Sequence, residues 1–80
     1  MEEYKQWLKN WFSEKGNLPT DVEDKNYFQI GLIDSFAVVE LIEAVESTFN
    51  ISFTEEHFQD RRFATIKGLA EIIHEIKKGK

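Results

Sequence analysis

Ser35 is the residue whose surroundings could support chemistry. It stands in the run Gly31-Leu32-Ile33-Asp34-Ser35-Phe36, directly before a glutamate-rich segment. Asp34 or Ser35 can act as an N-cap, because either side chain can accept a hydrogen bond from a free backbone N–H at a helix start. The same helix end carries roughly half a positive charge, which would stabilise a phosphodiester on the serine oxygen. Taken alone, the run favours a simple cap.

Other chemistry finds little support. His57 and His74 stand in no recognised catalytic spacing, and Ser35 lacks the flanking glycines of a nucleophile elbow. No glycine-rich phosphate loop occurs. With Cys 0, disulfides and thiolate metal sites are excluded. A calcium loop starting at Asp24 would place Gln29 where glycine is needed, so that motif fails. We expect neither catalysis nor a bound metal.

Helical elements must position Ser35. Apolar residues recur at the 3.6-residue period over 2–15, 35–49 and 66–77, and Thr54 predicts a capped short helix over 55–60. Asn50 and Thr65 are the expected C-cap and N-cap of the second and last helices. No segment alternates as a strand does. The expected fold is all-α, a small bundle of three main helices plus one short helix.

A long first connection, residues 16–33, separates the first two main helices. Gly16 and Pro19 are expected to end the first helix, and Thr20 with Glu23 can make a capping box for a single turn. The second half of the connection is too apolar for a free linker. We therefore expect it to pack on the bundle.

Length and composition favour one domain over residues 1–80. The chain is 41% hydrophobic and 14% aromatic, which is too apolar for a disordered chain. No apolar stretch approaches the ~20 residues of a membrane span, and the N-terminus has no signal-peptide pattern. We expect a soluble, cytoplasmic monomer.

The charge pattern bears on partners. The formal net charge is −5, which makes nucleic acid an unfavourable partner. No Lys or Arg occurs between Lys25 and Arg61, although this stretch holds seven acidic residues, which are Asp34, Glu40, Glu43, Glu46, Glu55, Glu56 and Asp60. This stretch is either a solvated acidic surface or a docking surface for basic partners.

Helix geometry refines the docking hypothesis. At about 100° per residue, Glu40 and Glu43 fall opposite the apolar stripe of helix 35–49, with Phe36 between them and Glu46 nearer the edge. An aromatic anchor ringed by carboxylates is the usual anatomy of a binding hot spot. The alternative is that Phe36 folds back under the preceding connection.

Together these features resemble the acyl carrier protein family. The resemblance rests on the run Gly31 to Phe36, on the acidic helix from Val38 to Glu46, and on the junctions Phe49-Asn50-Ile51 and Thr65-Ile66. It spans about Tyr27 to Ile76. It implies the four-helix carrier fold and a carrier without catalytic activity.

By this resemblance, a phosphopantetheinyl transferase attaches 4′-phosphopantetheine from coenzyme A to Ser35, with Asp34 helping to present the serine. The arm then holds an acyl, aminoacyl or peptidyl group as a thioester. The implied partners are that transferase, a loading ligase and a downstream transferase, whose basic patches would meet Glu40, Glu43 and Glu46. The expected partner-binding surface comprises these three glutamates together with Asp34 and Phe36.

Pathway and cargo stay open at this stage. Phe36 stands where fatty-acid carriers usually have leucine. A Ser-Phe pair after Leu-Ile-Asp is similar to the run found in D-alanyl carriers and in stand-alone peptide or polyketide carriers. Eleven aromatic residues (Trp 2, Tyr 2, Phe 7) predict a packed core and a short, polar or exposed cargo. The rival hypothesis is an acidic helical adaptor that binds a basic partner without a prosthetic group.

Overall fold

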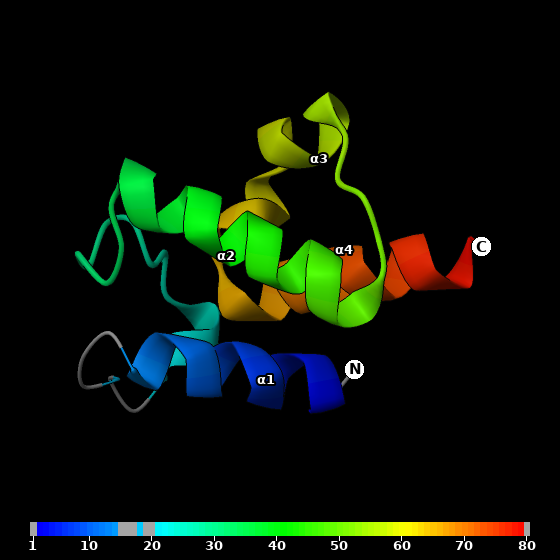
Figure 1. Ribbon diagram of the computed structural model, residues 1–80. Coiled ribbons are helices and arrows are strands. Elements are labelled where there is room, and N and C mark those ends of the chain that lie inside the picture. The colour runs from blue at the N-terminus through cyan, green and yellow to red at the C-terminus, as the bar shows by residue number, and fades with distance from the viewer. Residues whose placement is uncertain (1, 15–17, 19–20, 80) are drawn as a thin grey trace.

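The chain forms a small helical bundle, seen here in a computed structural model that describes residues 2–14, 18 and 21–79. Its helices are α1 (Glu2–Ser13), α2 (Ser35–Phe49), α3 (Glu55–Gln59) and α4 (Ile66–Lys78), with 3-10 turns η1 (Val22–Asp24) and η2 (Arg61–Ala64). Figure 1 shows α2 in front of α4, with α1 along one side of the bundle and the short α3 on the other. The described residues contain no strand, only an isolated bridge between Asn26 and Thr65. The all-α expectation is confirmed.

The core is built around α4. Six residues of this helix are buried, which are Ile66, Gly68, Leu69, Ala70, Ile72 and Ile73. The other main helices add Tyr4, Leu8 and Phe12 from α1 and Leu41 and Val45 from α2. The two tryptophans, Trp7 and Trp11, are half-buried and pack against this core. Burial of one face of each main helix therefore holds the bundle together.

The long connection packs on the bundle at its second half, as expected. Tyr27 is fully buried, and its hydroxyl donates a hydrogen bond to the backbone carbonyl of Phe63. Ile33 is also buried, whereas Phe28 and Ile30 are exposed. Burial raises the pKa of the Tyr27 phenol far above its usual range, so this hydroxyl stays a donor. The segment leading into α2 is anchored at two points.

Most predicted helix boundaries are confirmed. α2 spans the predicted residues and ends at Phe49, and the left-handed backbone of Asn50 (φ 55°) makes this next residue the C-cap. The Thr65 side chain accepts a hydrogen bond from the Gly68 N–H and caps α4. The backbone N–H of Thr54 donates to Nδ1 of His57, which closes the first turn of α3.

Some boundaries differ from the prediction. α1 ends at Ser13, and the predicted last residue Lys15 and the stop at Gly16 lie outside the described residues. The predicted cap Thr20 also lies outside them, and η1 follows Asp21 instead. α3 is one residue shorter than expected and α4 one residue longer. The turn η2 was not predicted. It forms because the Asp60 side chain accepts a hydrogen bond from the Arg62 N–H.

In the described part of the chain, no helix has the length and apolar character needed to cross a bilayer.

Candidate functional site: the start of α2

The start of α2 separates a capping residue from an available hydroxyl. Asp34 has extended backbone geometry, and its Oδ1 accepts hydrogen bonds from Phe36 N (3.1 Å) and Ala37 N (2.9 Å). Of the two caps that the sequence allowed, Asp34 is therefore the one used. Ser35 is exposed and is the first residue of the helix. No hydrogen bond from its hydroxyl to another described residue is present.

The turn before Ser35 is fixed by local hydrogen bonds. Asn26 Oδ1 accepts from Phe28 N and Gln29 N, and Leu32 N donates to the carbonyl of Tyr27 (3.0 Å). Gly31 adopts φ 77°, a left-handed geometry that strains other residues. Because Tyr27 itself is buried, this turn attaches the start of α2 to the core.

The serine fits a covalently attached phosphate group. Its oxygen lies at the N-terminus of a 15-residue helix, where the positive end of the helix dipole favours an anion. Ser35 is exposed and has no competing hydrogen-bond partner among the described residues, so a bulky group attached to it could extend into solvent. No group of three or more potential metal-ligating side chains occurs in the described part of the chain.

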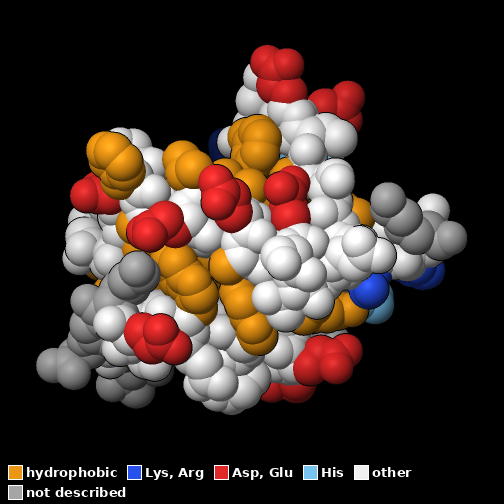
Figure 2. Space-filling model, in the orientation of Figure 1, with side chains coloured by type: hydrophobic (Ala, Val, Ile, Leu, Met, Phe, Trp, Pro, Cys, Tyr) orange, Lys and Arg blue, Asp and Glu red, His pale blue; other side chains and the backbone are white. Residues whose placement is uncertain are grey.

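The exposed side of α2 begins with an apolar residue beside carboxylates. Phe36 is 84% exposed and Val39 is 52% exposed. Phe36 therefore does not fold back under the preceding connection. Glu40 and Glu43 are exposed on the same helix. In Figure 2, hydrophobic and acidic side chains alternate along the upper part of this face, while basic side chains lie at its far end.

Glu46 differs from the other predicted docking residues. It is half-buried, and its Oε2 accepts a hydrogen bond from the backbone N–H of Phe53 (2.9 Å). This bond ties the last turn of α2 to the connection that leads into α3. The carboxylate of Glu46 thus has a structural partner within the bundle.

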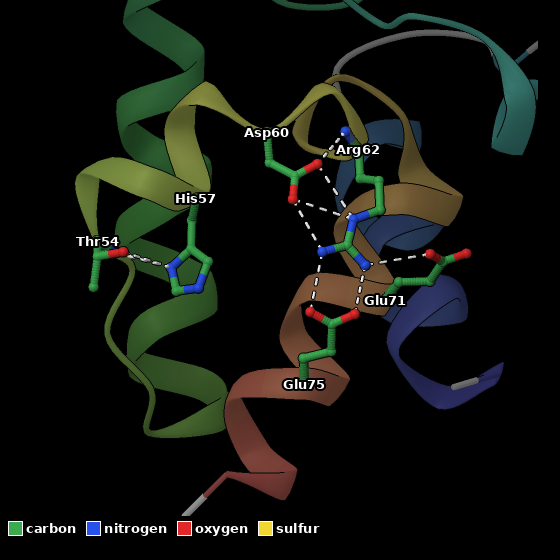
Figure 3. A network of polar contacts seen from close by, with 6 residues as sticks. All are labelled: Thr54, His57, Asp60, Arg62, Glu71 and Glu75. Carbon is green, nitrogen blue, oxygen red and sulfur yellow. Dashed lines mark hydrogen bonds and ion pairs between the residues drawn. The ribbon is translucent and has the colours of Figure 1, made fainter.

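Arg62 forms an ionic clamp behind α3, which the sequence analysis missed. It bonds to Asp60 in its own turn and to Glu75 on α4, and it also pairs with Glu71 (3.5 Å). Figure 3 shows these carboxylates converging on one guanidinium, with the Thr54–His57 contact beside them. The hydrogen bonds from Arg62 hold the pKa of both Asp60 and Glu75 below the usual range. The spacing of Glu71 and Glu75 on one helix face was the only hint in the sequence.

Comparison with known proteins adds three findings. The family described as "Phosphopantetheine attachment site" matches residues 6–73. D-alanyl carrier proteins of Streptococcus equi subsp. zooepidemicus (strain MGCS10565) and Streptococcus equi subsp. equi (strain 4047) are each 36% identical to the chain over 59 residues. Each alignment covers 69% of this chain and 75% of the relative. No solved structure matches the chain significantly.

Proposed function

This chain belongs to the phosphopantetheine attachment site family, and from that premise we propose that Ser35 carries the group. Membership makes the protein a carrier domain, which is typically non-catalytic, and makes covalent 4′-phosphopantetheine its cofactor. The rival hypothesis of an adaptor without a prosthetic group is set aside by this match. The thiol of the bound arm supplies the thioester chemistry that a cysteine-free chain lacks.

The availability of the Ser35 hydroxyl is the observation that carries the assignment. Asp34 takes the capping bonds, so Ser35 does not have to give up a helix contact in order to react. The positive end of α2 stabilises the phosphodiester that forms on its oxygen. The buried anchors Tyr27 and Ile33 hold the preceding turn, so that a transferase meets a preformed surface.

Docking of partner enzymes belongs to the same surface. Phe36 offers a large exposed apolar side chain next to Ser35, and Glu40 and Glu43 add charge on the same helix. Basic patches on the phosphopantetheinyl transferase, the loading ligase and a downstream transferase would meet these carboxylates, chiefly raising the rate of encounter. Asp34 and Glu46 have their carboxylates engaged within the fold and contribute less directly.

For the cargo, we favour a small aminoacyl group and name D-alanyl as the first to test. The similar relatives are D-alanyl carrier proteins, and the alignment covers most of each chain. The fully buried side chains of the core also favour a short cargo over a long acyl chain that needs internal space.

Intact mass spectrometry tests the attachment site. After incubation with coenzyme A and a broad-specificity phosphopantetheinyl transferase, the wild-type chain should gain one phosphopantetheine group, and Ser35→Ala should gain none. Ser47→Ala, which removes another exposed serine of α2, is the matched control and should be modified fully. A modified Ser35→Ala protein would refute the assignment.

Loading of the modified chain tests the cargo. The chain is incubated with ATP, D-alanine and a D-alanyl carrier ligase, and the thioester is detected as a mass gain that neutral hydroxylamine removes. The competing experiment offers a fatty acid and an acyl ligase. Faster loading with the fatty acid would contradict the proposed aminoacyl cargo while leaving the attachment site intact.

A further inference from the structure

A small cavity on α1 lies outside the attachment site. Trp7, Asn10, Trp11 and Glu14 line it, and its volume is about 280 Å³. This is just below the usual range for drug-sized ligands, which begins near ~300 Å³, so it has room for a small ligand. Figure 1 places the last turn of α1 at the same end of the bundle as the start of α2.

The two indole rings of the cavity are held by the core. Trp7 packs edge-on against Phe49 with ring centroids 5.4 Å apart, and Trp11 packs edge-on against Phe12 at 5.3 Å. A ligand therefore meets aromatic surfaces whose positions are already set, which lowers the entropic cost of binding.

Among the described residues that line the cavity, Glu14 is the charged one, and its charge is negative. Glu14 is exposed just beyond the C-terminal end of α1, where the backbone carbonyls carry about half a negative charge. A carboxylate at this end does not stabilise the helix, and the last turn holds no basic residue. The lysines earlier on α1, Lys5 and Lys9, are paired with Glu23 of η1.

We propose that this cavity binds the ammonium group of a small aminoacyl ligand, an inference that rests on the aminoacyl cargo proposed above. The electron-rich faces of Trp7 and Trp11 attract the cation, and the carboxylate of Glu14 pairs with it. In Figure 2 a band of hydrophobic side chains runs between α1 and α2 with acidic side chains on either side. The face thus combines apolar surface with negative charge, which suits an alkylammonium ion better than a neutral or anionic ligand.

Intrinsic fluorescence gives a direct test, because both tryptophans of the chain line the cavity. The Ser35→Ala protein, which lacks the proposed attachment site, is titrated with D-alanine methyl ester at slightly acidic pH, where the amino group is protonated. Methyl isobutyrate, in which a methyl group replaces the ammonium, is the neutral control. We expect a saturable change with the alanine ester and at least about fivefold weaker binding of the isobutyrate, which corresponds to about 1 kcal/mol.

Two variants locate the effect. Glu14→Gln should weaken the binding of the alanine ester about fivefold and leave the binding of the isobutyrate unchanged. Glu3→Gln removes an exposed carboxylate at the other end of α1 and should change the binding of neither ester. The absence of saturation, equal binding of both esters, or equal effects of the two variants would overturn the proposal. The mass experiment on the wild-type chain decides the attachment site independently of this result.

Discussion

Two adjacent residues divide the work at the start of α2. Asp34 supplies the cap and Ser35 the free hydroxyl, although the sequence allowed either residue to cap the helix. The run around them predicted where the helix starts, because capping chemistry is local. It could not predict which oxygen turns toward the backbone, since that depends on the extended geometry of Asp34 and on the turn before it.

This division predicts unequal effects of two neighbouring substitutions. Asp34→Ala removes both capping bonds and should lower the free energy of unfolding by ~1 kcal/mol, whereas Ser35→Ala should change it by much less. Urea denaturation measures both. Asp34→Asn keeps a capping oxygen without the charge and should retain most of the stability. Equal losses for Asp34→Ala and Ser35→Ala would show that the serine also caps.

The surface of α2 predicts two kinds of docking defect. Glu40→Lys with Glu43→Lys should slow phosphopantetheinylation most strongly at low salt, because steering by charge is screened by ions. Phe36→Ala should slow it with much less salt dependence, because its contact is apolar. Initial rates across a salt series measure both. The control variant, Glu3→Lys with Asp24→Lys, has the same net charge as the Glu40→Lys, Glu43→Lys variant. It should be modified at nearly the wild-type rate at every salt concentration.

A glycine sets the distance between η2 and α4. A Cβ atom built on Gly68 would lie 2.2 Å from the carbonyl oxygen of Arg62, so this contact requires a residue without a side chain. Gly68→Ala should therefore destabilise the fold by about 1–3 kcal/mol despite the higher helix propensity of alanine. Thermal melting measures the loss. Gly79→Ala, at the end of α4, meets its nearest backbone atom at 3.3 Å and should cost far less.

At the level of elements, the sequence predicted what depends on period and capping. The bounds of α2 followed from its apolar stripe and from Asn50. The turn η2 was not predicted, although its cap Asp60 is local; its attachment to α4 depends on Arg62, whose partner Glu75 lies 13 residues away. The contact between Arg62 and Glu75 exists only after α4 has packed against η2, and no local sequence pattern predicts it.

The Arg62 clamp gives the whole molecule a pH dependence of known sign. The pKa values of Asp60 and Glu75 are lowered in the folded chain, so the unfolded chain binds protons more readily. The clamp therefore stabilises the fold above the ordinary carboxylate range, and this contribution is lost as pH falls below about 5. The melting temperature of Arg62→Gln should be lower than that of the wild type at neutral pH. The gap should narrow on acidification, and a constant gap would contradict this role.

The packing of the whole molecule limits the cargo. Leu8 and Phe12 of α1 and Leu41 and Val45 of α2 are all fully buried in the hydrophobic core. The cavity described above is lined by three residues of α1 and by Glu14 directly after it, at the surface of the bundle. A long acyl chain could enter the core only by displacing these side chains, at a cost of about 1–3 kcal/mol for overpacking. We expect a long acyl group to stay outside the core.

Methyl NMR spectra of the phosphopantetheinylated protein test this expectation. Spectra recorded before and after loading with a long acyl group should agree at Leu41 and Val45, with changes confined to surface residues. Large shifts of these core methyl groups would show that the bundle opens for its cargo.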